Sequence, residues 1–281
     1  MELSYVDAGP GRNGQRLCIH HAPAGGAAAL GAFVYVHPFA EEMNKTRRMA
    51  ALQARAFAAA GHAVLQIDLA GCGDSSGEFR DATWADWVDD VLMALRWMRK
   101  RHAAPLWLWG ARAGCLVAAQ AAARFDEPVR LLLWQPVTSG ATQLAQFLRL
   151  RSAAALTQGA PDASGAPGTD IRQALAEGQT IEVAGYELAA PLAHALEQAR
   201  LDLPPQTPAC VWLETSTDEE PQLLPRTTKV IEAWQQQSIT VMARAVAGPA
   251  FWQSVEIEEA PALIEASVQA VESAGRTLEH A

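Results

Sequence analysis

The feature that most constrains the fold of this chain is an alternation of short apolar runs with amphipathic helical stretches between residues 32 and 136. Between two such runs, Trp84, Trp87, Val88 and Val91 recur at the spacing of one helix face. Because parallel strands are joined by helical crossovers, the alternation predicts an α/β fold with a mostly parallel central sheet flanked by helices. The predicted strands of this part span residues 32–36, 63–68, 106–109 and 129–134.

The alternation stops near residue 139 and resumes near residue 208. The intervening segment is expected to hold a helix at 144–156, a linker rich in Gly, Pro, Ser and Asp at 158–169, and a hairpin at 180–188 around Gly185. We therefore expect a core made of residues 1–139 and 208–281, with a helical cap insertion at 140–207. After the insertion, we predict strands at 209–213 and 239–242 and helices at 227–236 and 261–274.

The composition limits the cellular environments and the classes of binding partner expected for this protein. With 22 Lys and Arg against 31 Asp and Glu, the net charge of −9 argues against nucleic acid or an anionic membrane as the main partner. No secretory leader and no run of about 18 apolar residues is evident, so we expect a cytoplasmic protein without a membrane span. The four cysteines are far apart and form no CxxC pair, so the sequence indicates neither a disulfide framework nor a zinc site.

A strand is expected to turn directly into a helix at Gly110-Ala111-Arg112-Ala113-Gly114. Small residues on both sides of one large residue are typical of a nucleophile elbow, where a strained turn leaves room only for glycine or alanine beside the central residue. Here the central residue is Arg112, and a guanidinium stays protonated and has no lone pair for attack on an acyl carbon.

Several segments carry a resemblance to a known family. The strand that ends at His37-Pro38, the glycine-rich loop that follows Asp68, the elbow and the cap together resemble the α/β-hydrolase fold over nearly the whole chain. More narrowly, the chain is similar to the second of the two hydrolases associated with the exosortase A system. That narrower resemblance rests on HPFAEEMNKTRR (37–48), WGARAG (109–114), LLWQPVTSG (132–140), FLRLR (147–151) and VAGYEL (183–188).

The resemblance implies a bacterial, cytoplasmic protein whose gene lies in a locus for exopolysaccharide and surface-protein export, beside a first hydrolase relative. It also implies a Ser-His-Asp triad, of which this sequence retains one candidate. Asp218 stands at the expected offset for the acid, whereas Arg112 replaces the nucleophile and Trp252 lies where the base is expected. Loss of the nucleophile or of the base costs several orders of magnitude in acyl-transfer rate.

Two other residues are candidate nucleophiles by pattern. Ser75 is the centre of a literal G-x-S-x-G at 73–77, but that loop lies one strand too early and is more consistent with a glycine-rich connection. Cys115 follows the elbow glycine in the first turn of an apolar helix, where a buried structural thiol is the better interpretation.

Arg112 has two interpretations that the sequence leaves open. At the positive end of a helix it suits a carboxylate or phosphate ligand; alternatively Glu41, Glu42 or Asp218 neutralises it internally and closes the former active site. The residues expected to contact a ligand in this region are His37, Phe39, Glu41, Glu42, Arg112, Ala113 and Trp252.

Three functions follow from these patterns. The first is a non-catalytic hydrolase relative that binds an acyl or anionic small molecule or the paired hydrolase. The second is an active esterase, thioesterase or acyltransferase that uses Ser75, or a water positioned by His37 and Asp218. The third is an interaction scaffold with a filled pocket. No cofactor or metal is expected, since neither GxxxxGK[ST] nor a strand-linked GxGxxG is present.

Overall fold

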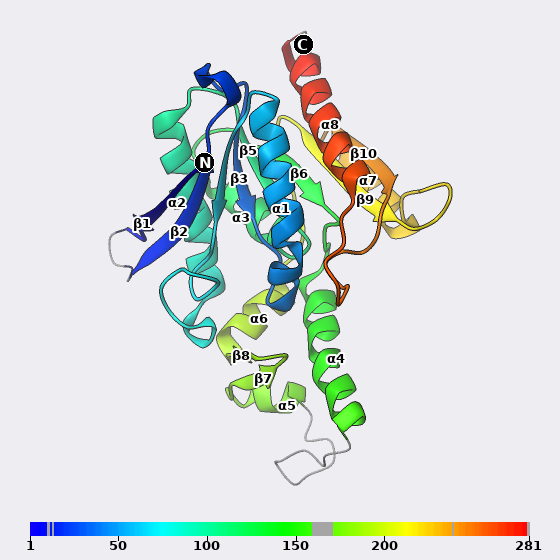
Figure 1. Cartoon of the computed structure of the whole chain (residues 1–281). Helices are drawn as coiled ribbons and strands as arrows, with labels where there is room; N and C mark the ends of the chain where they lie inside the picture. Colours follow the sequence, from blue (N-terminus) through cyan, green and yellow to red (C-terminus); the bar gives the residue numbers. More distant parts are fainter. Residues whose placement is uncertain (10–11, 13, 159–170, 238, 280–281) are drawn as a thin grey trace.

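The computed structural model shows one twisted sheet with helices on both faces and a smaller group of elements at one end of that sheet (Figure 1). The structure describes residues 1–9, 12, 14–158, 171–237 and 239–279. In this part of the chain, no helix is long and apolar enough to cross a membrane.

The sheet has eight strands in the order β1-β2-β4-β3-β5-β6-β9-β10. β1 and β2 form an antiparallel hairpin on one edge, and β2 is also antiparallel to β4, whereas all other neighbours are parallel. The predicted mostly parallel sheet is confirmed, although the N-terminal hairpin was not predicted. The strands are β1 (Glu2–Asp7), β2 (Gln15–His21), β3 (Ala32–Val36), β4 (Ala63–Ile67), β5 (Leu106–Ala111), β6 (Arg130–Trp134), β9 (Cys210–Ser216) and β10 (Val241–Ala247).

Two apolar layers hold helices against the sheet. α1 (Glu41–Ala59) and α8 (Pro261–Glu279) cover one face, where large rings such as Trp109 and Trp134 are fully buried. α2 (Trp84–Arg101), α3 (Gly114–Arg124) and α7 (Pro225–Gln236) cover the other face. The strands between them carry buried residues on both sides, which explains why they read as continuous apolar runs.

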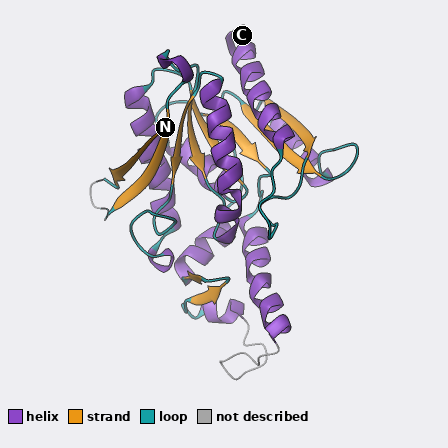
Figure 2. Ribbon diagram, in the orientation of Figure 1, coloured by secondary structure: helices purple, strands orange, loops and turns teal. Residues whose placement is uncertain are grey.

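The described residues between 140 and 207 lie at the carboxyl end of the parallel strands (Figures 1 and 2). This segment contains α4 (Gly140–Gln158), α5 (Ile171–Ala176), the hairpin of β7 (Ile181–Val183) and β8 (Tyr186–Leu188), and α6 (Ala190–Gln198). The helix and the hairpin expected here are present, and α6 was not predicted. The expected linker falls, beyond its first residue, outside the described residues.

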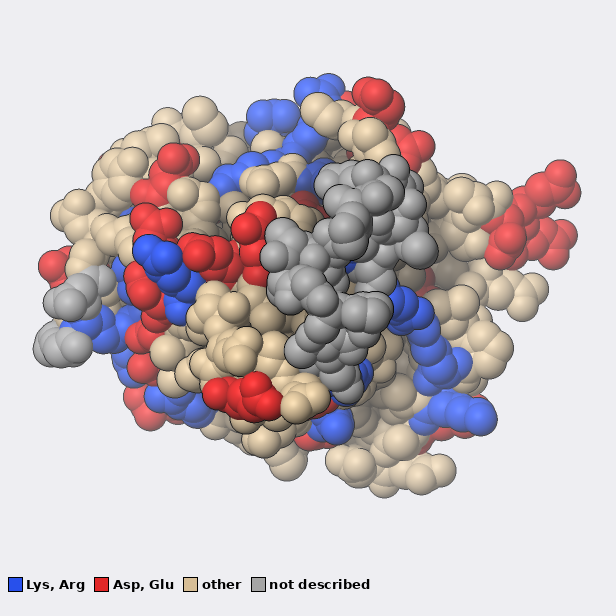
Figure 3. All heavy atoms as spheres, turned by 90° about the horizontal axis from the view of Figure 1, so that it is seen from below, with Lys and Arg blue, Asp and Glu red and all other residues tan. Residues whose placement is uncertain are grey.

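The surface at this end carries charges of both signs. Figure 3 looks onto it, and its visible part shows blue and red side chains interspersed around the undescribed segment. An intermixed surface of this kind does not generate the field of a single sign that attracts a polyanion.

Candidate functional site

Arg112 occupies the turn between β5 and α3. Its φ of +53° lies in the left-handed region that side chains other than glycine rarely adopt. The backbone N–H of Arg112 donates to the carbonyl of Trp134 at 2.9 Å, and its own carbonyl accepts the N–H of Cys115 at 3.1 Å. These two bonds fix the strained turn, so the chain builds a nucleophile elbow around a residue that cannot act as a nucleophile.

The glycines beside Arg112 are required by close backbone approach. A Cβ on Gly110 would lie 2.7 Å from the Cα of Cys115, and a Cβ on Gly114 would lie 2.4 Å from the carbonyl oxygens of Val36 and His37. Since real Cβ atoms do not approach backbone this closely, Gly110 is required by the contact of β5 with the start of α3, and Gly114 by the contact of α3 with the end of β3.

The Arg112 side chain forms a buried ion pair with Glu42 of α1. A terminal guanidinium nitrogen lies 3.2 Å from Oε1 of Glu42, and Nε donates to both carboxylate oxygens at 3.3 Å. The two side chains are 8% and 6% exposed. Of the three carboxylates considered from the sequence, Glu42 is the one in this pair, and it neutralises Arg112 away from water.

Three further groups surround the guanidinium. Nη1 donates to the carbonyl of Gln135 at 3.3 Å, and Nη2 donates to Oε1 of Gln146 on α4 at 3.4 Å. The ring of Trp252 lies 5.1 Å from the guanidinium carbon, within range of a cation–π contact. Sequence reasoning missed Gln135 and Gln146; the position of Gln135 directly after the strand next to β5 was the available signal.

Little empty space is left beside Arg112. The cavity between Arg112, Thr46, Trp134 and Trp252 has a volume of about 10 Å³. That is about the volume in which one water molecule fits, and far below the several hundred Å³ of a small-molecule pocket.

Residues with strained backbone conformations cluster around the Arg112–Glu42 pair. Of the four residues other than glycine with positive φ in the described chain, three belong to the site or its flanks: Ala40 (φ +49°), Arg112 (+53°) and Gln135 (+42°). Ala40 directly precedes α1, which carries Glu42, and Gln135 directly follows β6. Strained residues of this kind persist only where the surroundings impose them, so the neighbouring elements hold the turn of a nucleophile elbow around Arg112.

His37 and Glu41 border the same region. His37 is buried, its Nδ1 lies 2.7 Å from the carbonyl of Pro38, and its Nε2 accepts the N–H of Leu69 at 3.2 Å, which engages both ring nitrogens. Burial lowers the pKa of His37, which keeps the ring neutral. Burial raises the pKa of Glu41, and the repulsion from Glu42 raises it further.

Phe39 and Ala113 are also buried. The ring of Phe39 contacts the rings of Phe79, Trp87 and Phe147 with centroid separations between 5.1 and 5.9 Å, so it belongs to an aromatic cluster. Ala113 directly precedes α3 and is 2% exposed.

The carboxylate at the acid position does not face Arg112. Asp218 is exposed and accepts a hydrogen bond from Oγ of Ser216 at 2.7 Å. The buried carboxylate of this region is Glu214 on β9, which accepts hydrogen bonds from the indole of Trp212, the hydroxyl of Thr227 and the N–H of Leu224. Glu214 therefore ties β9 to α7.

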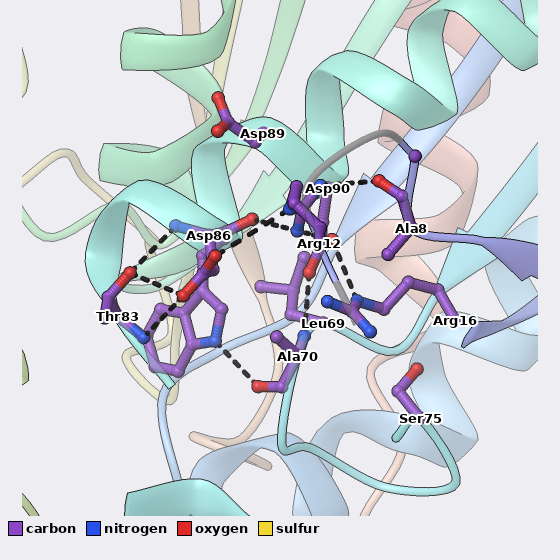
Figure 4. A network of polar contacts seen from close by, with 12 residues as sticks. Ala8, Arg12, Arg16, Leu69, Ala70, Ser75, Thr83, Asp86, Asp89 and Asp90 are labelled. Carbon is purple, nitrogen blue, oxygen red and sulfur yellow. Dashed lines mark hydrogen bonds and ion pairs between the residues drawn. The ribbon is translucent and has the colours of Figure 1, made fainter. Parts of the chain in front are cut away.

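Ser75 is held by the backbone on both sides. Its hydroxyl donates to the carbonyl of Asp68 at 2.5 Å and accepts the N–H of Leu17 at 2.9 Å, and the residue is buried. Figure 4 shows it beside the buried ion pairs of Arg12 and Arg16 with Asp90. A hydroxyl engaged in this way links the glycine-rich loop to β2, and within the described residues no side chain that could act as a base forms a hydrogen bond with it.

The cysteines are suited to packing. All four are buried and free, and Cys115 is 0% exposed. Burial raises the pKa of the Cys115 thiol well above its ordinary value, so the reactive thiolate is scarce. Within the described residues, no group of three or more His, Cys, Asp or Glu side chains is arranged to hold a metal ion.

Comparisons with known proteins agree with this architecture. The family model described as "Serine aminopeptidase, S33" (Hydrolase_4) matches residues 27–182, which is more than half of the chain. No curated protein matches the sequence.

Solved structures share the fold at low sequence identity. A ferulic acid complex of Est1E from Butyrivibrio proteoclasticus is 16% identical, covers 96% of this chain and 98% of its own, and has a TM-score of 0.62. XC6422 from Xanthomonas campestris, an α/β serine hydrolase without lid, is 17% identical over 97% and 94% of the two chains, with a TM-score of 0.54. Mouse α/β hydrolase domain-containing protein 10 is 15% identical over 99% and 100%, with a TM-score of 0.54. Together with the elbow at Arg112, the family match identifies this chain as a member of the α/β-hydrolase family of the serine aminopeptidase S33 type.

Proposed function

We propose that this protein is a non-catalytic α/β hydrolase that acts by binding. The observation that carries the proposal is the Arg112–Glu42 ion pair, which occupies the nucleophile elbow with two buried side chains. An acyl-transfer mechanism needs a nucleophile and a base at this place, and the side chains with which Arg112 interacts in the described chain are those of Glu42, Gln146 and Trp252.

The active-enzyme alternative is less well supported by the contacts of its candidate residues. The Ser75 hydroxyl bonds two backbone groups, the ring of His37 bonds Pro38 and Leu69, and Asp218 is exposed and bonded to Ser216. Each group is thus engaged in a local structural contact rather than in a relay that would activate water or serine.

The cavity beside Arg112 also bears on the choice of ligand. Because it holds about 10 Å³ and Glu42 already neutralises the guanidinium, an acyl or anionic ligand would enter only by displacing Glu42. We therefore favour a protein partner at this end of the molecule, with residues 140–207 as a cap insertion over the closed elbow.

The partner that the sequence resemblance suggests is the first hydrolase relative of the exosortase A system, in a bacterial exopolysaccharide locus and in the cytoplasm. The test is co-expression of the two proteins, followed by size exclusion at micromolar concentration. Co-elution supports the pairing, and elution as separate monomers overturns it.

Catalysis is tested separately with short-chain p-nitrophenyl esters. We expect wild-type turnover to equal that of the Arg112→Met variant and to stay at the uncatalysed background. Turnover above background that Ser75→Ala abolishes would support the active-enzyme alternative.

A further inference from the structure

A groove of about 540 Å³ lies at the opposite edge of the structure from β10, between the end of β1 and the outer side of α2. Its lining comes from Val6–Gly9, from α2 between Asp89 and Arg101, and from the single residues Arg12 and Arg124. None of these residues contributes to the cavity at Arg112, so the groove is a separate feature of the molecule.

The floor of the groove is apolar. Leu92 is buried in the core, and Val6, Met93 and Trp97 are partly buried and packed against the same core. Side chains that are anchored on one side in a packed core present a fixed apolar surface on the other side.

At one end of the groove the arginines are neutralised within the protein. Arg12 forms ion pairs with Asp86 and Asp90, as Figure 4 shows, and a terminal nitrogen of Arg124 lies 2.8 Å from Asp89. The cations at this end therefore carry little attraction for a ligand.

At the other end the positive charge is not compensated. Arg96 and Lys100 are exposed, and neither has an ion-pair partner among the residues that the structure describes. Arg101 stacks on Trp97, with its guanidinium carbon 3.5 Å from the ring centroid. Three cations thus gather beside the apolar floor in a chain whose net charge is −9.

The length of the groove bears on what it can hold. From Asp89 to Arg101, α2 rises about 18 Å, so the groove is elongated along this helix. A single alkyl chain can lie along an apolar floor of this length.

We propose that this groove binds a single-chain anionic amphiphile, with its alkyl chain along Val6, Leu92 and Met93 and its head group on Arg96, Lys100 and Arg101. The assignment rests on the uneven distribution of charge in the groove. An anionic head group matches the end with uncompensated cations, and an apolar chain matches the floor that extends toward the neutralised end. The proposal does not depend on the state of the elbow at Arg112.

The test is calorimetric titration of the full-length protein with dodecanoate below its micelle concentration. We expect saturable 1:1 binding that weakens at least tenfold in the Arg96→Glu/Lys100→Glu double variant. The matched control is Arg226→Glu/Lys229→Glu, which makes the same charge change at two exposed positions of α7 and should bind like the wild type.

Three further probes test which charge the head group must carry and whether the ligand is a free amphiphile or a membrane surface. Dodecyl phosphate should bind in the same groove, with the same loss in the Arg96→Glu/Lys100→Glu variant, whereas dodecyltrimethylammonium should not bind. Equal dodecanoate binding by both double variants, or no saturable binding, would overturn the proposal. So would sedimentation with anionic phosphatidylglycerol vesicles in the absence of dodecanoate binding, because it would indicate a membrane surface.

Discussion

The guanidinium of Arg112 and the carboxylate of Glu42 lie 3.2 Å apart, and both are nearly inaccessible to solvent. One comes from the turn between β5 and α3 and the other from the first turn of α1, two elements that converge at the carboxyl edge of the sheet. In an enzyme of this fold the same turn presents a serine to substrate. Here it presents a charge that is satisfied by the protein itself.

Replacing one partner of this pair should lower the free energy of unfolding far more than replacing both. Arg112→Met leaves Glu42 buried without a counter-charge, and Glu42→Leu leaves Arg112 in the same situation, so each should lower the free energy of unfolding by about 3–5 kcal/mol. The double variant should lie close to the wild type. Urea unfolding of all four proteins measures the coupling.

If each single variant cost less than about 1 kcal/mol, the pair would behave like an exposed ion pair. That result would contradict a buried, internally neutralised elbow.

Ser75→Ala should reduce stability because it removes a hydroxyl that joins Asp68 to Leu17. The N–H of Leu17 then loses its buried acceptor, and a loss of about 1–3 kcal/mol is expected. Ser76→Ala is the matched control, since the hydroxyl of Ser76 accepts an exposed bond from the N–H of Gln15 and should contribute less. Equal costs for the two substitutions would argue against the structural role of Ser75.

Gly114→Ala should disrupt the elbow. Its Cβ would meet two carbonyl oxygens at 2.4 Å, so we expect a loss of several kcal/mol or failure to fold. Gly275→Ala on α8 meets nothing within 4 Å and should stabilise the protein by about 0.5–1 kcal/mol through helix propensity. Thermal melts of both variants check the contrast, and a tolerated Gly114→Ala would contradict the described contact between β3 and α3.

Acid should destabilise the protein through buried histidines. Burial, and after it the facing ring of His102, lower the pKa of His20 to about 4. The unfolded chain binds the proton near pH 6.5, so stability is constant above that value, falls as the pH decreases from about 6.5 to 4, and changes no further through this group below pH 4.

Melting temperatures at pH 7.5 and pH 5 measure this slope. His20→Gln should flatten it, while His194→Gln, at an exposed position of α6, should not. An unchanged slope in His20→Gln would show that His20 does not contribute.

Much of the architecture could be predicted because its signals are local. Four of the six parallel strands, β3 to β6, were predicted within two residues of both ends, because strands buried on both faces have continuous apolar sequences, whereas the strand predicted at 209–213 ends three residues before the end of β9. The last strand, β10, was placed too early because its pattern alternates on an exposed edge. The hairpin of β1 and β2 was missed for a related reason: β1 is largely exposed, so its apolar residues do not mark one buried face.

The site could be predicted only in part. The strained turn at Arg112 follows from five consecutive residues. Which glutamate pairs with Arg112, Glu42 or Glu41, depends on the direction in which α1 begins after Ala40. The contact with Gln146 depends on where α4 lies relative to the elbow, and no local pattern encodes that placement.

The most direct test of the central claim is intact-mass analysis after incubation with a fluorophosphonate probe, which reacts with activated serines. The wild type, Ser75→Ala and Ser76→Ala should all remain at their unmodified masses, because the hydroxyls of Ser75 and Ser76 bond backbone groups rather than a base. Stoichiometric labelling of the wild type that one of these substitutions abolishes would contradict the account and identify an active serine hydrolase.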